Sequence, residues 1–514
     1  MRFVRRSGAS AGRASWRLVR AAWLLVVSLA WGAAALAQAS GYEQGGQGSA
    51  QASYRVINLG PGTIAAYPHI NATGQVAFSM IGGGRTAGFF YDGTVVKNIG
   101  SLGGANVYVA GLNDAGQVAG TSLNEHGIEN AFVWTAGGGM LGIRSGTGGG
   151  RSYGLAINRH GVVTGSFSNT PDGPARPFRW SAAGGVEDLG LAPGLPWPSS
   201  GRVLNDAGLI AGVATVDDEQ THAFAWTRSG GTVAIDTQGS VESAPVAVGA
   251  GGEVAGNRLA SFEDGGDRPF LWTRAGGMVD LGTGRGTTAW VNAMTPGLHI
   301  AGGIGYADGR QRAMSWTRRS GMRELGTLGG RTSVARDVNA RGQIVGFAED
   351  RTGAMRAFVW SASGGMFDLN QALHRAPPGL VLEQALSIND SGAIVASSNA
   401  GLVLLRPGGG HGGGYVPGHV LGPVVAPASV TIGTRLEAKV GFMDDDETGT
   451  RSIHWSWGDG SARQAGKLRE SGGAGTASAS HGYAAPGIYE LVVTVVDRDG
   501  RSTAVSHRVE VTEN

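Results

Sequence analysis

Two expected loops near the C-terminus carry the side chains best suited to metal chemistry. An acidic run begins at Asp444, and a second group of carboxylates follows the last long apolar stretch. Carboxylates gathered on loops supply the hard oxygen ligands that Ca²⁺ prefers. A solvated acidic surface without a metal is the alternative interpretation. The sequence therefore predicts a candidate calcium site and no other cofactor, and its candidate ligands are Asp444, Asp445, Asp446, Asp497 and Asp499.

Motifs of catalytic type occur only in contexts that do not suit them. The pattern G-x-S-x-G appears at 8–12, inside the expected leader, and at 150–154, between two repeats, without the strand–turn–helix that a nucleophile elbow needs. The pattern G-x-G-x-x-G appears at 137–142 and 408–413, and neither match opens a helix. The 11 histidines form no close pair at a metal-binding spacing. We therefore predict no catalytic residue and no enzymatic activity.

The composition indicates a chain that turns often. Glycine accounts for 92 of the 514 residues, while charged residues make up 16% and hydrophobic residues 41%. Glycine does not recur at every third position, which excludes collagen. The chain has no cysteine, which excludes disulfides, thiol catalysis and cysteine zinc sites. Abundant glycine in a chain with enough apolar residues for a core favours many short strands.

The N-terminus resembles an export signal over residues 1–37. It contains six arginines and no acid, then an apolar stretch, then Ala35-Leu36-Ala37 as a cleavage site. The apolar stretch is shorter than the ~20 residues that span a bilayer, and an uncleaved membrane anchor is the alternative. Residues 38–53 are expected to be disordered. Without the leader the chain is mildly acidic and its arginines are scattered, so nucleic acid is not an expected partner.

An internal repeat of about 45 residues fills most of the chain, which is the length of a four-stranded propeller blade. The nonapeptide Leu112–Gly120 recurs as Leu204–Gly212, and related segments end at Phe78, Gly165, Gly256, Gly302, Gly346 and Ala396. A second motif keeps the same spacing, as in Ala131–Trp134, where Phe132 and Trp134 alternate on one strand face. Each repeat is therefore expected to be an antiparallel meander of four strands.

Each nonapeptide contains a turn that suits type I geometry, as in Asn113–Gly116. The turn asparagines have two interpretations, contact with a ligand at one mouth of the ring or turn geometry, and we favour the second. They are Asn71, Asn113, Asn158, Asn205, Asn339 and Asn389, whereas Gly249 and Thr295 occupy the same position in the fifth and sixth units. The repeated tryptophans can stack on sugars or pack between blades, and their regular spacing favours packing.

The two ends of the repeat region predict that it closes on itself. The eighth unit stops before its fourth strand, whereas Tyr54–Gly60 matches the fourth-strand motif and precedes the first turn. Pairing of Tyr54–Leu59 with Leu402–Leu405 would complete the eighth unit and bury both sheet edges. We therefore predict an all-β protein with an eight-bladed propeller over residues 54–406. An open β-solenoid is the rival architecture.

The repeat region resembles the bacterial extracellular HAF-repeat family. The family's tripeptide appears as His222-Ala223-Phe224, and its Leu-Gly-Gly signature appears in Ser101–Gly104 and Thr327–Gly330. The resemblance implies export and a repeat scaffold, and it implies no known chemistry. The glycine or threonine at the fifth and sixth turn positions departs from the pattern, so these two turns are expected to differ.

A glycine-rich linker is expected over residues 407–423, followed by a β-sandwich of immunoglobulin-like size over 424–514. The sandwich resembles a PKD (polycystic-kidney-disease) domain. Its Trp455–Ser461 segment is similar to the family's Trp-x-Phe-Gly-Asp-Gly core, and His481 and Tyr483 match the next segment of the family's pattern. Such domains serve adhesion or substrate contact in extracellular proteins.

These features together predict an exported, non-enzymatic binding or adhesion protein. Its expected location is the cell surface, the periplasm or the medium. Its expected partner is an extracellular protein or a polysaccharide, it has no membrane span after signal removal, and a monomer is the default state. Binding is expected at the loops that vary most between units, 124–130, 167–176 and 260–268. A propeller glycan hydrolase or lyase acting at the central channel and a structural surface or matrix component are the alternatives.

Overall fold

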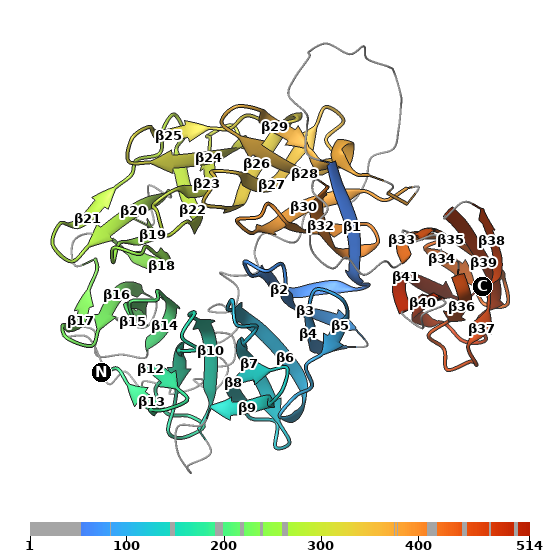
Figure 1. The fold of residues 1–514 in the computed structure, drawn as a ribbon, viewed down its shortest axis with the longest axis horizontal. Coiled ribbons are helices and arrows are strands. Elements are labelled where there is room, and N and C mark those ends of the chain that lie inside the picture. Colours follow the sequence, from blue (N-terminus) through green and yellow to red (C-terminus); the bar gives the residue numbers. More distant parts are fainter. Residues whose placement is uncertain are drawn as a thin grey trace, which may run out of the picture. The chain divides into compact units, whose positions relative to one another are not determined.

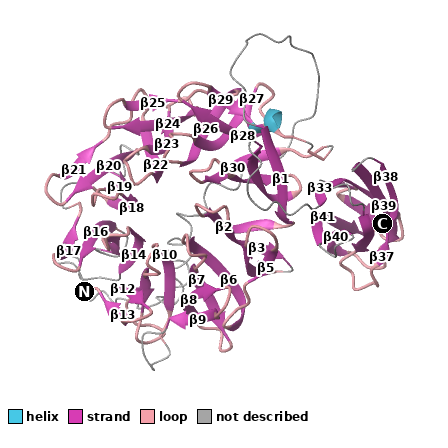
Figure 2. Cartoon of the chain, in the orientation of Figure 1, coloured by secondary structure: helices cyan, strands magenta, loops and turns pink. Residues whose placement is uncertain are grey.

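The computed structural model describes residues 53–513, apart from 83, 144–149, 191–198, 216–219, 237–239, 260–265, 375, 378, 409–418, 445–449, 472–473 and 498–501. The expected signal peptide and the segment 38–52 lie outside these residues. The described chain is almost entirely strand and turn (Figure 2), with one 3-10 helix, η1 (Leu369–Ala372). This confirms the all-β prediction.

The first four repeats each form one antiparallel four-stranded sheet, as the repeat predicted. Blade one contains β2 (Thr63–Ile70), β3 (Val76–Gly82), β4 (Arg85–Tyr91) and β5 (Val96–Asn98). Blade two contains β6 (Gly103–Leu112), β7 (Val118–Asn124), β8 (Glu129–Thr135) and β9 (Gly139–Ile143). Blade three contains β10 (Ser152–Ile157), β11 (Val163–Phe167), β12 (Arg176–Ser181) and β13 (Gly185–Asp188). Blade four contains β14 (Ser199–Leu204), β15 (Ile210–Thr215), β16 (Thr221–Thr227) and β17 (Gly231–Ala234).

The next three repeats follow the same strand order. Blade five contains β18 (Glu242–Val248), β19 (Val254–Leu259), β20 (Asp267–Thr273) and β21 (Gly277–Asp280). Blade six contains β22 (Thr288–Met294), β23 (Ile300–Gly305), β24 (Gln311–Thr317) and β25 (Gly321–Glu324). Blade seven contains β26 (Gly329–Val338), β27 (Ile344–Asp350), β28 (Met355–Ser361) and β29 (Gly365–Asp368). In Figure 1 the first strand of each blade faces the centre of the ring and the fourth strand lies at the rim.

Blade eight takes its fourth strand from the other end of the repeat region. Its order is β30 (Leu382–Ile388), β31 (Ile394–Ser398), β32 (Gly401–Gly408) and β1 (Ser53–Gly60). In the β1–β32 pair, Val56 lies opposite Leu405 and Ile57 opposite Leu404. The predicted pairing is therefore confirmed, and the propeller is eight-bladed and closed rather than an open solenoid. Closure matters because blade eight then has four strands like every other blade, and β32 is not left as an edge strand.

A glycine in the second strand of six blades fixes how closely that strand approaches the first. A Cβ added at these glycines would lie 1.8–2.3 Å from a carbonyl oxygen of the first strand, so only glycine fits. They are Gly120, Gly165, Gly212, Gly256, Gly302 and Gly346. The motif phenylalanine of the third strand packs over the glycine, as Phe132 does over Gly120, and is fully buried. Burial of one such ring contributes about 2–3 kcal/mol to folding.

The C-terminal module is a two-sheet sandwich that begins at His419, inside the segment expected to be linker. One sheet has the order β33 (His419–Val425), β35 (Arg435–Asp444), β39 (Ala474–Gly482) and β38 (Lys467–Ser471). The other has the order β34 (Ser429–Thr431), β41 (Ser502–Thr512), β40 (Gly487–Asp497), β36 (Thr450–Ser456) and β37 (Gln464–Ala465). Phe442 from the first sheet and Trp455 from the second share one buried core, which confirms the immunoglobulin-like sandwich.

Candidate functional site

The turn between the first and second strands of each blade lies at the inner side of the ring, and its asparagine joins that blade to the next. In blade one, Asn71 Oδ1 accepts a hydrogen bond from Gln75 N at 2.9 Å, which holds the turn. Asn71 Nδ2 then donates to the backbone oxygen of Asn113 in blade two at 3.1 Å. Each turn therefore uses one amide both to shape itself and to hold its neighbour.

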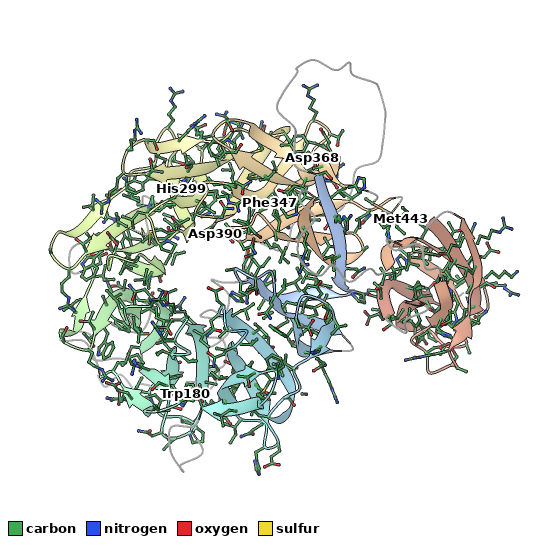
Figure 3. The ribbon with its side chains drawn as sticks, in the orientation of Figure 1. Trp180, His299, Phe347, Asp368, Asp390 and Met443 are labelled. Atoms are coloured by element: carbon green, nitrogen blue, oxygen red, sulfur yellow. The ribbon has the colours of Figure 1, made fainter. Side chains whose placement is uncertain are left out.

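The same inter-blade bond recurs around the propeller. Asn113, Asn158 and Asn205 each donate to the turn of the following blade at 2.9–3.1 Å. Asn339 donates to Asn389 O at 3.0 Å, and Asn389 donates to Asn71 O at 2.9 Å, which closes the circle. Figure 3 shows Asp390, the next residue of the last turn, at the inner side of blade eight. These side chains are occupied by the scaffold, which agrees with turn geometry rather than ligand contact.

Blades five and six depart from this pattern, as their sequences predicted. Gly249 has no side chain, and the backbone substitutes, because Ala250 N donates to Pro296 O at 3.2 Å. In blade six, Thr295 Oγ1 accepts from His299 N at 3.0 Å and so replaces only the turn-shaping half of asparagine. Leu298 occupies the usual glycine position with a φ of +66°, a left-handed conformation that costs a non-glycine residue about 1–2 kcal/mol. The hydrogen bonding between blades therefore differs at these two turns from the asparagine pattern of the other six.

Every innermost strand carries a β-bulge three residues before its turn position. The pairing in blade four passes from Gly201 to Val203 and leaves Arg202 as the extra residue. In blade seven it passes from Ala335 to Asp337 and leaves Arg336. The extra residues of the other blades are small, apolar or amide-bearing: Ala110, Leu155, Val246, Asn292, Leu386 and, in the wider bulge of blade one, Tyr67 and Pro68. Bulges re-aim side chains and recur next to functional sites.

At the bulge of blade seven, the side chain extends along the inner side of the ring, as one contact shows. The guanidinium carbon of Arg336 lies 5.5 Å from the ring centroid of Tyr67. Arg336 belongs to blade seven and Tyr67 to blade one, so their contact passes in front of the inner strand of blade eight. Arg336 also lies 5.1 Å from the ring centroid of Phe347 in its own blade. A cation held between two aromatic rings is positioned by packing as well as by charge.

Arg202 and Arg336, here called the inner arginines, are partly buried cations. Burial lowers the pKa of both guanidinium groups from its usual value, most simply in Arg202, where burial acts alone. Arg202 Nε is inaccessible to solvent and has no hydrogen-bond partner, and no described carboxylate forms an ion pair with the Arg202 side chain. A desolvated charge without a counter-charge destabilises a fold, so Arg202 calls for a functional explanation.

Asp337, the next residue along β26, joins blades seven and eight. Its Oδ2 accepts hydrogen bonds from Ile388 N at 2.8 Å and from Ser387 Oγ at 3.1 Å, both in blade eight. Burial raises the pKa of Asp337 against the opposing effect of these hydrogen bonds. The scaffold therefore uses this carboxyl group at the inner end of the interface between the two blades.

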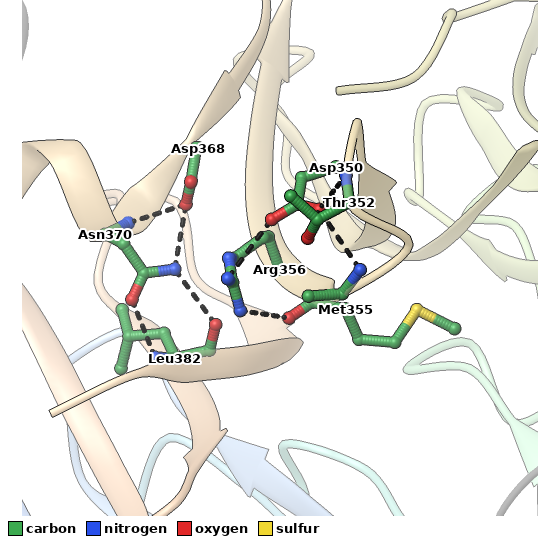
Figure 4. A network of polar contacts seen from close by, with 8 residues as sticks. Asp350, Thr352, Met355, Arg356, Asp368, Asn370 and Leu382 are labelled. Atoms are coloured by element: carbon green, nitrogen blue, oxygen red, sulfur yellow. Dashed lines mark hydrogen bonds and ion pairs between the residues drawn. The ribbon is translucent and has the colours of Figure 1, made fainter. Parts of the chain in front are cut away.

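A second junction between the same blades joins η1, which follows the outer strand of blade seven, to the start of β30 in blade eight (Figure 4). Asn370 Nδ2 donates to Leu382 O at 3.0 Å, and Leu382 N donates back to Asn370 Oδ1 at 2.7 Å. Asp368 Oδ1 accepts from Asn370 Nδ2 at 2.8 Å and so orients that amide. Arg356 forms an ion pair with Asp350 at 3.1 Å, so the arginine drawn in this view has a structural partner. These polar groups therefore stabilise the scaffold through partners within the fold, whereas Arg202 has no ion-pair partner among the described residues.

A different titratable cluster lies where blades four and five meet. Glu242 and Asp267 both flank Leu259, Glu242 by pairing in the first strand and Asp267 in the third. Their Cα atoms are therefore two strand spacings apart, roughly 10 Å, on one face of the sheet. Burial, and then the charge of Asp267, raise the pKa of Glu242, whereas His222 opposes the shift. Burial also raises the pKa of Asp267. His222 Nδ1 is inaccessible to solvent and has no partner among the described residues.

The Trp455–Ser461 motif of the sandwich builds its core. Trp457 stacks on His481 with ring centroids 4.9 Å apart, and His481 Nε2 lies 2.6 Å from Asp459 Oδ2. Partial burial opposes ionisation of Asp459, but hydrogen bonds from Ser461 and His481 hold its pKa at about 2. Tyr483 OH donates to Trp457 O at 3.1 Å. The residues that carry the PKD resemblance are therefore structural here.

The predicted calcium ligands are placed only in part. Asp445, Asp446 and Asp499 lie outside the described residues, while Asp444 and Asp497 are the last residues of β35 and β40. Within the described ranges, no group of three or more acidic or histidine side chains is arranged to hold a metal. The calcium site stays a prediction.

The loops that vary between repeats include stretches of ordinary turn. Asn124 shapes the turn at 124–130 by accepting hydrogen bonds from His126 N and Ile128 N. Part of the loop at 260–268 lies outside the described residues.

The inner arginines were missed by the sequence prediction. Comparison of the position three residues before each turn was the available signal, since only Arg202 and Arg336 are charged there.

Comparison with known proteins supports the C-terminal assignment. Residues 421–512 match the PKD domain family. A comparison with curated proteins finds no match to the chain. In the described part of the chain, no helix has the length and apolar character needed to cross a membrane.

Solved structures with some similarity share little sequence with this chain. TolB from Acinetobacter baumannii is 11% identical, with a TM-score of 0.31, over 49% of this chain and 62% of that protein. An extracellular domain of a putative hybrid two-component system from B. thetaiotaomicron is 8% identical, with a TM-score of 0.28, over 90% of this chain and 100% of that domain. An Aleuria aurantia lectin mutant in complex with Fucα1-6GlcNAc is 10% identical, with a TM-score of 0.27, over 53% of this chain and 94% of the lectin.

Proposed function

We propose that this chain is an exported, non-enzymatic binding protein whose propeller holds an extracellular ligand at its inner edge. The observation that carries the proposal is the contrast between a uniform scaffold and a non-uniform interior. Turns, glycines and core rings repeat from blade to blade, whereas the bulge position holds Arg202, Arg336 or Tyr67 in some blades and small, apolar or amide-bearing residues in others. Rigid scaffolds with variable inner positions suit binding.

The C-terminal sandwich supplies the second part of the proposal. Its match to the PKD domain family suits an extracellular protein, and we propose that it acts as a spacer or second contact for an extracellular protein or polysaccharide. The HAF-repeat resemblance belongs to this proposal as well. Its tripeptide His222-Ala223-Phe224 lies in β16, and its Leu-Gly-Gly segments lead into β6 and β26.

A screen of the secreted chain, residues 38–514, tests this function. The protein is labelled and applied to arrays of extracellular glycans and to immobilised polysaccharides, and Tyr67→Ala is run in parallel. We expect saturable binding that Tyr67→Ala weakens at least tenfold, measured at a temperature where unfolding curves show the variant folded, because Tyr67 also packs against the core between blades eight and one. Concentration-dependent self-association in the absence of any ligand, with no binding in the screen, would instead favour the structural surface component.

The cluster of Glu242, Asp267 and His222 favours a second candidate function, hydrolysis of a glycan. Inverting glycosidases need two carboxyl groups about 6.5–9.5 Å apart, a general acid with a raised pKa and a general base that is ionised. The backbone spacing of Glu242 and Asp267 is compatible with that distance, and the raised pKa of Glu242 suits the general acid. The discriminating assay is release of reducing ends from any polysaccharide that the chain binds. Activity in the parent protein that is lost in both Glu242→Gln and Asp267→Asn would establish the enzyme, and intact polysaccharide after prolonged incubation would exclude it for that substrate.

A further inference from the structure

The inner edge of the propeller carries positive charge at two of its bulges. Arg202 lies on β14 and Arg336 on β26, each as the extra residue of the bulge. Many arginines of the propeller form ion pairs with acids, and Arg258, whose Nε also lacks a hydrogen-bond partner, pairs with Asp280 at 2.8 Å. Arg202 differs from Arg258, because among the described residues no carboxylate pairs with it. At Arg202 the interior therefore has the electrostatics of an anion site.

We propose that the inner edge of the propeller binds an acidic polysaccharide through its oxyanionic groups, with Arg202 and Arg336 as the cations that recognise it. The inference rests on the proposed binding function and specifies its ligand class. A guanidinium group matches carboxylate and sulfate oxygens by two parallel hydrogen bonds, which makes arginine the suited residue for this task.

The positions of the inner arginines favour a polymer with repeated charges over a single small anion. Arg202 is in blade four and Arg336 in blade seven, with two complete blades between them along the ring. One small oxyanion cannot contact both, whereas an oligosaccharide with an acidic group on each residue can. Tyr67 adds an aromatic face beside Arg336, and aromatic faces pack against sugar rings. Asn292 in the bulge of blade six donates to Ala335 O at 2.7 Å and helps to fix the strand that carries Arg336.

The stability of the free protein offers a second, independent signature at Arg202. An arginine kept for ligand binding is a cost to the unliganded fold when its charge is desolvated without a counter-charge. Replacing it with methionine keeps most of the side-chain volume and removes the charge. Arg202→Met is therefore expected to unfold at the same or a higher temperature than the parent chain while binding less ligand. If Arg202 had a purely structural role, Arg202→Met would unfold at a lower temperature than the parent chain.

The experiment measures binding of the secreted chain by titration calorimetry with four probes: oligogalacturonate, its methyl ester, dextran sulfate and dextran. We expect the parent to bind oligogalacturonate, dextran sulfate or both, and to bind neither neutral counterpart. Binding of oligogalacturonate but not of dextran sulfate would identify the carboxylate as the preferred group. Binding of dextran sulfate but not of oligogalacturonate would identify the sulfate. Arg202→Met and Arg336→Met are each expected to weaken binding about 10- to 100-fold. Arg228→Met is the matched control, because this side chain is 72% exposed and forms a surface ion pair with Glu187.

Three results would overturn the proposal. Binding of neutral glycans or of the methyl ester, with no binding of the acidic forms, would refute acidic recognition and leave the general binding function intact. Acidic binding that falls equally in Arg228→Met and in the two inner variants would show non-specific attraction. A parent chain that binds nothing in this set or in the wider glycan screen would end both the inference and the proposed function.

Discussion

Asn389 stands at the closure of the propeller, and its replacement by alanine tests how much the ring of turn hydrogen bonds stabilises the fold. The side chain is 6% exposed. Its Nδ2 donates to Asn71 O in blade one at 2.9 Å, and its Oδ1 accepts from Ala393 N at 2.9 Å and from Ser391 Oγ at 2.7 Å. Asn389→Ala removes one bond between blades and two within the turn.

The expected magnitude follows from which groups lose their partner. Ala393 N is buried and donates to Asn389 Oδ1, so the loss of this acceptor costs about 1–3 kcal/mol. Asn71 O also accepts from Gly74 N at 3.0 Å, so it is not left without a donor, and the lost inter-blade bond costs the usual net value of about 1 kcal/mol. Asn389→Ala is therefore expected to lower the free energy of unfolding by about 2–4 kcal/mol.

A matched control exists inside blade two. Asn124 shapes a turn of the same kind, with Oδ1 accepting from His126 N at 2.9 Å and from Ile128 N at 3.0 Å. Its Nδ2 donates to Asn130 in the same blade, so no inter-blade bond is involved. Asn124→Ala removes the two turn bonds and leaves the buried Asn130 Oδ1 without its donor, so it is expected to cost about 2–4 kcal/mol without loosening any contact between blades.

The assay is urea unfolding of the secreted chain followed by tryptophan fluorescence, with hydrogen exchange of the β2 and β30 amides as a local probe. Both variants are expected to lower the midpoint, and only Asn389→Ala is expected to speed exchange in β2 and β30. A free energy of unfolding for Asn389→Ala within about 0.5 kcal/mol of the parent value, with unchanged exchange at both strands, would refute a stabilising role for ring closure by the turn amides.

Further predictions concern pH, close packing and calcium. Burial lowers the pKa of His69 from 6.5 to about 4, so the folded protein keeps it neutral while the unfolded chain binds a proton. Stability should be full above pH 6.5 and fall by about 3 kcal/mol as the pH drops to about 4, and His69→Gln should flatten that fall in urea titrations. Gly212→Ala should destabilise by about 2 kcal/mol or more, because its Cβ would lie 2.1 Å from Ser200 O, whereas Gly137→Ala has open space and should be neutral in the same measurement. Millimolar calcium should raise the unfolding temperature of the secreted chain, and Asp445→Asn should remove that increase. An unchanged unfolding temperature, together with no heat of binding in a calorimetric titration with calcium, would exclude the site.

The architecture was predictable because its determinants are local and repeated. Four strands per unit follow from turns and alternation inside each segment of about 45 residues, and eight copies of the same signal reinforce one another. Closure was predictable from a mismatch at the two ends, since Tyr54–Gly60 matches a strand that the eighth unit lacks. The pairing of Val56 with Leu405 then completes the eighth blade as the fourth strand completes every other.

The candidate site was not predictable in the same way, because its residues are exceptions to the repeat. The sequence prediction sought function in loops of variable length and in acidic clusters. The inner bulge leaves no length change in the sequence, since all eight units contain it. The contact of Arg336 with Tyr67 joins residues of blades seven and one, and only the three-dimensional closure of the ring brings them together.

The bulge also explains why a rigid repeat can carry such exceptions. Its extra residue makes no ladder contact with the second strand, so its side chain takes a different partner in each blade: Asn292 donates to Ala335 O, and Leu386 packs in the core between blades eight and one. The close approach beside it is maintained by a glycine, as Gly212 faces Ser200 O in blade four and Gly346 faces Val334 O in blade seven. These glycines belong to the repeat and appear whether or not the bulge carries a charge.

A substitution at the bulge therefore changes the chemistry of the interior without changing the blade. A long basic side chain such as Arg202 is accommodated at the cost of an unpaired charge rather than a distorted sheet. The proposed separation of scaffold and interior places the ligand specificity of the propeller at the bulge positions that reach the inner side of the ring. Exchanging bulge residues between blades should then move the binding determinants around the ring, and the unfolding midpoint should fall only where the exchanged residue, such as Leu386, packs in the core.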